Sequence, residues 1–217
     1  MSNAFIFMME ILGTVAFAVS GALVAISGSL DLFGVVFVGC ITAVGGGILR
    51  DVLMGRFPPD IFSATPVLAL AVLTSIFVFV LSYCKRKSFD DFKKRLDVIN
   101  NYFDAAGLAI FTVIGVEKAG EAGFGGHFVF VICMGLLTGV GGGVLRDILV
   151  DQTPSVLQKH IYAVASLVGA IVYFFGKLFF DRTVAILISV VLIVLMRLLA
   201  TGFRWQLPKI DLDETKK

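Results

Sequence analysis

Charged residues are scarce in this sequence: Asp, Glu, Lys and Arg make up 16% of its 217 residues, whereas hydrophobic residues make up 58%. A soluble globular domain usually has about 25% charged residues. The mean hydropathy is +0.98, and the formal net charge is only +2. This composition excludes a soluble domain and gives no sign of nucleic-acid binding. It indicates an integral membrane protein whose surroundings are membrane lipids.

Cysteine and histidine are also rare. The three cysteines, Cys40, Cys84 and Cys133, stand singly in or beside apolar segments, so neither a disulfide framework nor a metal cluster is expected. The sequence has no Ser-His-Asp or paired-carboxylate constellation on a soluble surface. No basic stretch precedes the first apolar run, so a cleavable signal is not expected. We therefore expect no enzyme activity, no metal site and no cofactor.

Seven stretches are apolar enough to cross about 30 Å of hydrocarbon, which takes about 20 residues. They are 5–27, 33–55, 64–84, 99–116, 127–150, 158–176 and 183–203. The sequence therefore predicts an all-α membrane protein with seven transmembrane helices. An odd number of spans places the termini on opposite sides, and twelve Lys and Arg residues fall on the C-terminal side against five on the other. The positive-inside rule predicts a multi-pass inner (plasma) membrane protein with the N-terminus outside and the C-terminus cytoplasmic.

One motif occurs twice. Residues 42–53 read TAVGGGILRDVL, and residues 138–149 read TGVGGGVLRDIL. Three consecutive glycines weaken a helix by about 1 kcal/mol each relative to alanine, and an Arg-Asp pair is costly at membrane depth unless it faces protein or water. Close helix packing is the alternative role for membrane glycines, as for Gly135 and Gly139 with their small-xxx-small spacing. Two copies that each combine glycines with a charged pair favour a permeation or substrate path.

The candidate site residues form three groups. The glycines expected to kink the second and fifth helices are Gly45, Gly46, Gly47, Gly141, Gly142 and Gly143. The charges expected to line, gate or brace a pore are Arg50, Asp51, Arg146 and Asp147, and the hydroxyls expected there are those of Thr42 and Thr138. An interrupted helix is tolerated in a membrane only against protein or water, where its free carbonyls can coordinate a cation. The ions expected to bind are K⁺ or Na⁺.

The repeat extends into the neighbouring spans. Its further matches pair Glu10, Gly13, Phe17, Gly21 and Pro58 with Asp104, Gly107, Phe111, Gly115 and Pro154. Two three-helix units of opposite orientation are therefore predicted, with a seventh helix that has no counterpart. The predicted division is 1–84 first repeat, 85–98 cytoplasmic basic linker, 99–176 second repeat, 177–203 seventh helix and 204–217 polar tail. Glu10 and Asp104 are expected to cap helices or to face a cation vestibule.

The 3+3+1 pattern of spans and the two GGGxxRDxL motifs at 45–53 and 141–149, each followed by a proline, resemble prokaryotic members of the trimeric intracellular cation (TRIC) channel family. The repeat of this family is also described as glycine-transporter-like. The resemblance implies a homotrimer in which each protomer has a pore for monovalent cations, mainly K⁺, between the second and fifth helices. It places the glycine triplets at the kinks and both Arg-Asp pairs close to the path.

Two other functions stay open. The first is an alternating-access carrier for a small neutral solute such as glycine, because inverted repeats usually rock between two states. The second is a structural membrane module that binds partners through the tail 204–217. An ohmic K⁺ conductance in liposomes would indicate the channel, whereas saturable uptake would indicate the carrier.

Overall fold

The computed structural model describes residues 2–85, 89–158, 161–203 and 205. Within these residues the regular structure is entirely helical. The elements are α1 (Ser2–Ser27), α2 (Leu32–Leu53), η1 (Asp60–Phe62), α3 (Thr65–Lys85), α4 (Phe89–Ala119), η2 (Gly120–Phe124), α5 (Phe128–Leu149), α6 (Ser155–Gln158), α7 (Tyr162–Gly176) and α8 (Arg182–Gly202). The chain is therefore an all-α membrane protein.

Six of the described helices are long and apolar enough to cross a bilayer, namely α1, α2, α3, α4, α5 and α8. The segment predicted as a sixth span, 158–176, forms a shorter apolar helix, α7, that begins only at Tyr162. At about 1.5 Å per residue its 15 residues cover less than the hydrocarbon thickness. Between α5 and α7 the chain is attached to α5, where the Ser155 amide donates a hydrogen bond to Asp147.

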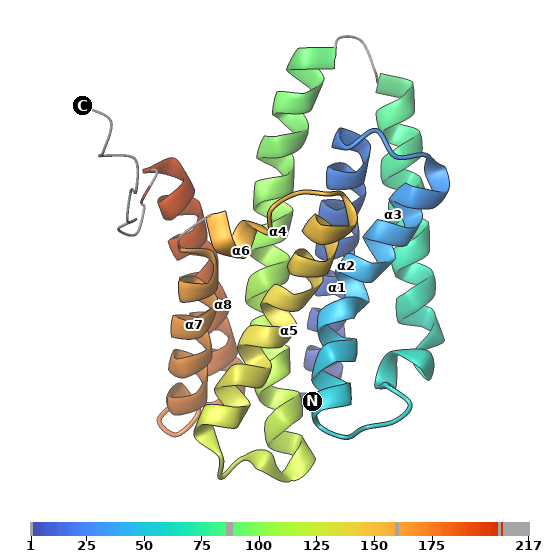
Figure 1. Ribbon diagram of the computed structural model, residues 1–217. Helices are drawn as coiled ribbons and strands as arrows, with labels where there is room; N and C mark the ends of the chain where they lie inside the picture. The colour runs from blue at the N-terminus through green and yellow to red at the C-terminus, as the bar shows by residue number, and fades with distance from the viewer. Residues whose placement is uncertain (1, 86–88, 159–160, 204, 206–217) are drawn as a thin grey trace, which may run out of the picture.

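The helices are arranged as two related units (Figure 1). In one unit α2 and α3 pack on α1, and in the other α5 and α7 pack on α4. The units meet through α1 against α4 and α2 against α5, and α8 covers α4 and α7 from one side. Figure 1 shows α2 and α5 crossing the bundle in opposite directions, so their charged ends lie at opposite ends of the molecule.

The charged segment 85–98, predicted as a linker, is partly helical. Helix α4 begins at Phe89 and continues for 31 residues without a break, whereas the apolar run alone predicted a start near residue 99. The early turns carry many charges, and hydropathy does not detect a helix that extends beyond the membrane. The polar tail 204–217 lies outside the described residues except for Trp205.

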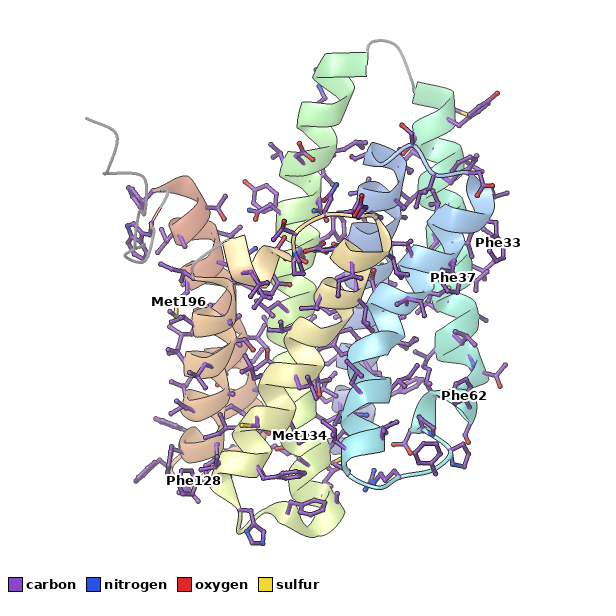
Figure 2. The ribbon with its side chains drawn as sticks, viewed as in Figure 1. Phe33, Phe37, Phe62, Phe128, Met134 and Met196 are labelled. Atoms are coloured by element: carbon purple, nitrogen blue, oxygen red, sulfur yellow. The ribbon has the colours of Figure 1, made fainter. Side chains whose placement is uncertain are left out.

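Large apolar side chains cover the outside of the bundle. Figure 2 shows Phe33 and Phe37 projecting outward from α2, and Phe62 and Phe128 near the opposite end. All four are exposed in the protomer, with Phe33 at 76%. An apolar exterior of this kind suits hydrocarbon or another protein as its neighbour. The polar side chains of interest lie inside.

Candidate functional site

Both glycine triplets lie within continuous α-helix. Helix α2 runs from Leu32 to Leu53, and α5 runs from Phe128 to Leu149. Among the described glycines, positive φ angles occur only at Gly55 and Gly123, outside both triplets. The expectation of interrupted helices with free carbonyls is therefore wrong for this conformation. Packing on neighbouring helices outweighs the low helix propensity of glycine, and a bend at the triplets stays a prediction.

The glycine triplets allow α2 and α5 to cross at close distance. A Cβ atom at Gly46 would overlap the carbonyl oxygen of Thr138, and a Cβ atom at Gly142 would overlap the carbonyl oxygen of Thr42. These two contacts are equivalent under the sequence repeat. Only glycine lets the two backbones approach so closely. The middle of the crossing is therefore packed in this conformation.

The two threonine hydroxyls are used within their own helices. Thr42 donates to the Val38 carbonyl and Thr138 to the Met134 carbonyl, both at 2.6 Å. Both threonines are buried. A hydroxyl that bonds the carbonyl four residues earlier is a common arrangement in membrane helices. The hydroxyl protons therefore point at their own helices rather than into an open path.

The first Arg-Asp pair lies in the last turn of α2. Arg50 Nε donates to Asp51 Oδ1 at 2.9 Å, and the other oxygen, Oδ2, accepts from the Asp60 amide at 3.1 Å. Both side chains are buried, with 5% and 1% exposed. The carboxylate thus neutralises the arginine and fixes η1 on the helix end, which reduces the cost of burying both charges.

A cavity of about 190 Å³ opens beside this pair. Its wall carries the charged groups of Glu10, Arg50, Asp51, Asp60 and Lys118. Toward the interior the same cavity reaches the apolar side chains of α4 and the third glycine of the first triplet. Three acids against two bases make this wall weakly favourable to cations.

The second Arg-Asp pair repeats this geometry at the other end of the bundle. Arg146 Nε donates to Asp147 Oδ1 at 2.8 Å, and Asp147 Oδ2 accepts from the Ser155 amide at 2.6 Å. Arg146 makes two further bonds through Nη1, to Ser20 at 2.6 Å and to Asp104 at 2.7 Å. The second pair is therefore tied into a larger buried network.

Two residues that the sequence repeat does not predict complete this network. The Tyr162 hydroxyl donates to Asp104 at 3.2 Å, and Arg197 Nη2 donates to Asp104 at 3.3 Å. The Arg197 guanidinium also lies 4.4 Å from the centre of the Tyr162 ring. The sequence could have indicated Arg197, because it lies in the middle of the last apolar span and charged residues within membrane helices are usually functional.

Asp104 has a role other than the expected helix cap. It lies deep within α4, which begins at Phe89, and only 3% of it is exposed. Its counterpart Glu10 lies within α1, which begins at Ser2, and faces the cavity. The cap interpretation was wrong because it took the apolar boundary for the helix start.

An aromatic pair separates the two polar ends. Phe17 and Phe111, equivalent in the repeat, have ring centroids 5.2 Å apart, and Phe111 lines the cavity. Along α1 the order is Glu10 in the cavity, Phe17 at the pair and Ser20 in the Arg146 network. The described residues thus place an apolar barrier between two polar regions.

The outer side of the α2/α5 crossing has a different character. A groove of about 430 Å³ lies there, lined by leucines such as Leu49, Leu137 and Leu145. Such a surface suits lipid chains rather than ions. The polar groups that could accompany a cation lie on the opposite side of the crossing, toward α1 and α4.

Comparison with known proteins covers nearly all of the chain. The profile of the family described as Glycine transporter matches residues 7–83 and again 101–177. The UPF0126 inner membrane protein YadS of Escherichia coli K12 is 37% identical over 96% of this chain and 98% of its own. The UPF0126 membrane protein YvgT of Bacillus subtilis is 32% identical over 93% and 94%.

Solved structures with the same fold are available. A prokaryotic TRIC channel crystallised in 0.5 M KCl superposes with a TM-score of 0.85 at 33% identity, covering 94% of this chain and 100% of that one. The trimeric intracellular cation channel orthologue from Rhodobacter sphaeroides gives a TM-score of 0.82 at 29% identity, covering 93% and 99%. The fold therefore relates the chain to TRIC channel structures that also share 29–33% of its sequence.

Proposed function

The chain belongs to the trimeric intracellular cation (TRIC) channel family and has UPF0126 membrane proteins among its sequence relatives. From that membership we propose that it conducts monovalent cations, mainly K⁺. The transport class follows from the family. The choice of ion and the route are the parts proposed here.

The proposed pore lies inside each protomer between α2 and α5, on the side of their crossing that faces α1 and α4. The observation that supports this route is the cavity of about 190 Å³ beside Arg50 and Asp51, whose wall carries three acidic and two basic side chains. The repeat supplies a second polar region at Arg146 and Asp147 at the far end. A cation that enters at one region leaves through the other.

The described conformation is the closed state in this proposal. Phe17 and Phe111 form a hydrophobic constriction between the polar regions, and such constrictions gate channels by excluding water. Conduction then needs these rings to separate, with the glycine crossing at Gly46 and Gly142 as the pivot. A bend of α2 and α5 at the glycines accompanies opening.

We further propose a homotrimer with one pore in each protomer and with K⁺ or Na⁺ bound transiently along the path. The Rhodobacter sphaeroides relative is a trimeric channel, and the exposed apolar faces of the protomer offer surface for association. Native mass spectrometry in detergent measures the stoichiometry directly. A monomer that conducts would leave the pore proposal standing and remove the trimer.

The test of function is a recording from purified protein in planar bilayers with asymmetric KCl. Unitary ohmic currents that reverse near the K⁺ equilibrium potential are the expected result. A lack of unitary currents, together with slow and saturable uptake of labelled glycine into liposomes, would instead establish the carrier. The carrier remains the second candidate for two reasons. The matching family is described as Glycine transporter, and the polar region beside Arg50 and Asp51 holds a cavity whereas the one at Arg146 is filled by hydrogen-bonded side chains.

A further inference from the structure

Thr14 differs from the other buried threonines of the described chain. Thr42, Thr112 and Thr138 each donate a hydrogen bond to the carbonyl oxygen four residues earlier in their own helix. Thr14 on α1 is also buried, with 1% exposed, but its hydroxyl has no hydrogen-bond partner among the residues that the structure describes. It lines the cavity of about 190 Å³. Because a buried hydroxyl without a partner is unfavourable, we expect a ligand in the cavity to supply one.

Glu10 is the acid of this cavity whose charge the protein does not balance. It lies one helical turn before Thr14, on the same face of α1. Both bases of the cavity wall already have carboxylate partners. The guanidinium and carboxylate of the first Arg-Asp pair lie 2.7 Å apart, and Lys118 Nζ lies 3.7 Å from Asp60 Oδ2. Within the described part of the chain, Glu10 has neither an ion pair nor a hydrogen bond.

The two side chains lead from the mouth of the cavity toward the aromatic barrier. Phe17 follows Thr14 along α1 with only Val15 and Ala16 between them, and Phe111, the other ring of the barrier, lines the cavity. Gly47 leaves space on the α2 side, where the nearest listed atom to an added Cβ is 3.8 Å away. Thr14 is therefore the last polar side chain of α1 before the barrier.

The second repeat has no equivalent of this pair. The position that matches Glu10 is Asp104, which is bonded to Arg146 at 2.7 Å. The position that matches Thr14 is Leu108, which is fully buried in the apolar core. A leucine at this position shows that the fold of a repeat does not need a hydroxyl there. The hydroxyl is thus a feature of one end of the protein only.

The chemistry of the pair suits a small cation of single charge. Carboxylate and hydroxyl oxygens are ligands for hard cations. In the described part of the chain, no group of three or more His, Cys, Asp or Glu side chains could hold a metal ion. The several carboxylates that a divalent ion usually requires are therefore not brought together, whereas one carboxylate balances one monovalent cation.

We propose that Glu10 and Thr14 form a binding site for a monovalent cation in this cavity. The Glu10 carboxylate supplies the charge, and the Thr14 oxygen replaces one water of the hydration shell on the inner side. This inference rests on the proposed channel function and names the first place at which the ion is held. The ion gives up part of its water there, immediately before the barrier of Phe17 and Phe111.

The test is the dependence of thermal unfolding on the cation, measured by circular dichroism on purified protein in detergent. The melting temperature in KCl is compared with that in N-methylglucamine chloride at equal ionic strength, because the organic cation is too large for both side chains to coordinate. K⁺ is expected to raise the melting temperature by about 2–4 °C, since a ligand that binds only the folded protein stabilises it. Glu10→Gln and Thr14→Val are each expected to abolish this difference.

Matched variants control for the chemical change itself. Thr74→Val makes the same replacement in the apolar groove between α1, α3 and α4, and Glu121→Gln removes an acid that is paired with Arg182. Both are expected to keep the K⁺ effect, and so is Thr14→Ser, which retains the hydroxyl. Each variant is compared with itself in the two salts, so its basal stability does not enter. If Thr14→Val is not folded by gel filtration, Thr14→Ala takes its place.

Four outcomes overturn the proposal. They are no K⁺ shift in the parent protein, a shift that survives Glu10→Gln or Thr14→Val, a shift that is lost in Thr74→Val or Glu121→Gln, and a larger shift with MgCl₂ at equal ionic strength, which would identify a divalent site. The measurement does not depend on current. The expected pattern without unitary currents would disprove the proposed channel and leave the cation site in place, whereas currents without a K⁺ shift would do the reverse.

Discussion

Gly46 and Gly142 occupy equivalent places on the crossing helices α2 and α5. Gly46 lies against the carbonyl oxygen of Thr138, and Gly142 lies against the carbonyl oxygen of Thr42. This reciprocal contact holds α2 and α5 together at the centre of the protein. It explains why glycine occurs there without any break in either helix.

The close crossing predicts that alanine substitution at adjacent glycines has different effects on the unfolding free energy. Gly46→Ala and Gly142→Ala are each expected to lower the unfolding free energy by about 1–3 kcal/mol, because a methyl group would overlap backbone that cannot move aside. Gly47→Ala is the control, since its nearest neighbour is 3.8 Å away. Thermal unfolding in detergent measures the effect, and equal loss in all three variants would contradict the crossing.

Replacing the aspartate by asparagine is expected to lower the unfolding free energy more in the first Arg-Asp pair than in the second. Asp51→Asn leaves Arg50 buried without its carboxylate and is expected to cost about 3–5 kcal/mol. Asp147→Asn is expected to cost less, because Arg146 keeps Asp104 at 2.7 Å. Urea or SDS titrations of the two variants compare them directly. If Asp147→Asn were the more damaging change, the network around Asp104 would not be supporting Arg146.

The aromatic constriction predicts a gain of conduction. Phe111→Ala removes one ring of the Phe17–Phe111 pair and is expected to increase the open probability in bilayers, because water then enters the constriction more easily. A stability cost of about 3–5 kcal/mol accompanies the change. Phe128→Ala, on the exposed surface, is the control and should leave the currents unchanged. Unaltered currents in both variants would place the gate elsewhere.

The charge at the cavity predicts a salt-dependent conductance. Glu10→Gln is expected to lower the unitary K⁺ conductance at low ionic strength, because Glu10 lines the cavity at the proposed entrance. The difference from the unmodified protein should disappear near 1 M KCl, where the screening length falls to about 3 Å. Glu121→Gln removes an exposed acid paired with Arg182 and serves as the control. A Glu10→Gln effect that persists at high salt would indicate a structural role.

Several features could be predicted from the sequence because they depend on local pattern. Long apolar runs must become helices in a membrane, and a duplicated motif in units of three spans must produce inverted units. The same reasoning identified Arg50, Asp51, Arg146 and Asp147 as pairs. Each arginine does bind the aspartate that follows it, since adjacent side chains at a helix end need no distant partner.

Other features could not be predicted because they depend on contacts between distant segments. Whether a glycine triplet unwinds or packs depends on what lies opposite, and here the opposite helix carries the same motif. The helical start of α4 at Phe89 is hidden from hydropathy, so the place of Asp104 within that helix was misjudged.

The sequence by itself determined that this chain is a duplicated, all-helical membrane protein with a charged pair at the end of each glycine-rich helix, because hydrophobicity and repetition act along the chain. Only the tertiary structure decided that one polar region is open and the other filled, because Asp104, Tyr162 and Arg197 come from three helices. That convergence depends on how α8 packs on α4 and α7. No local pattern carries that information.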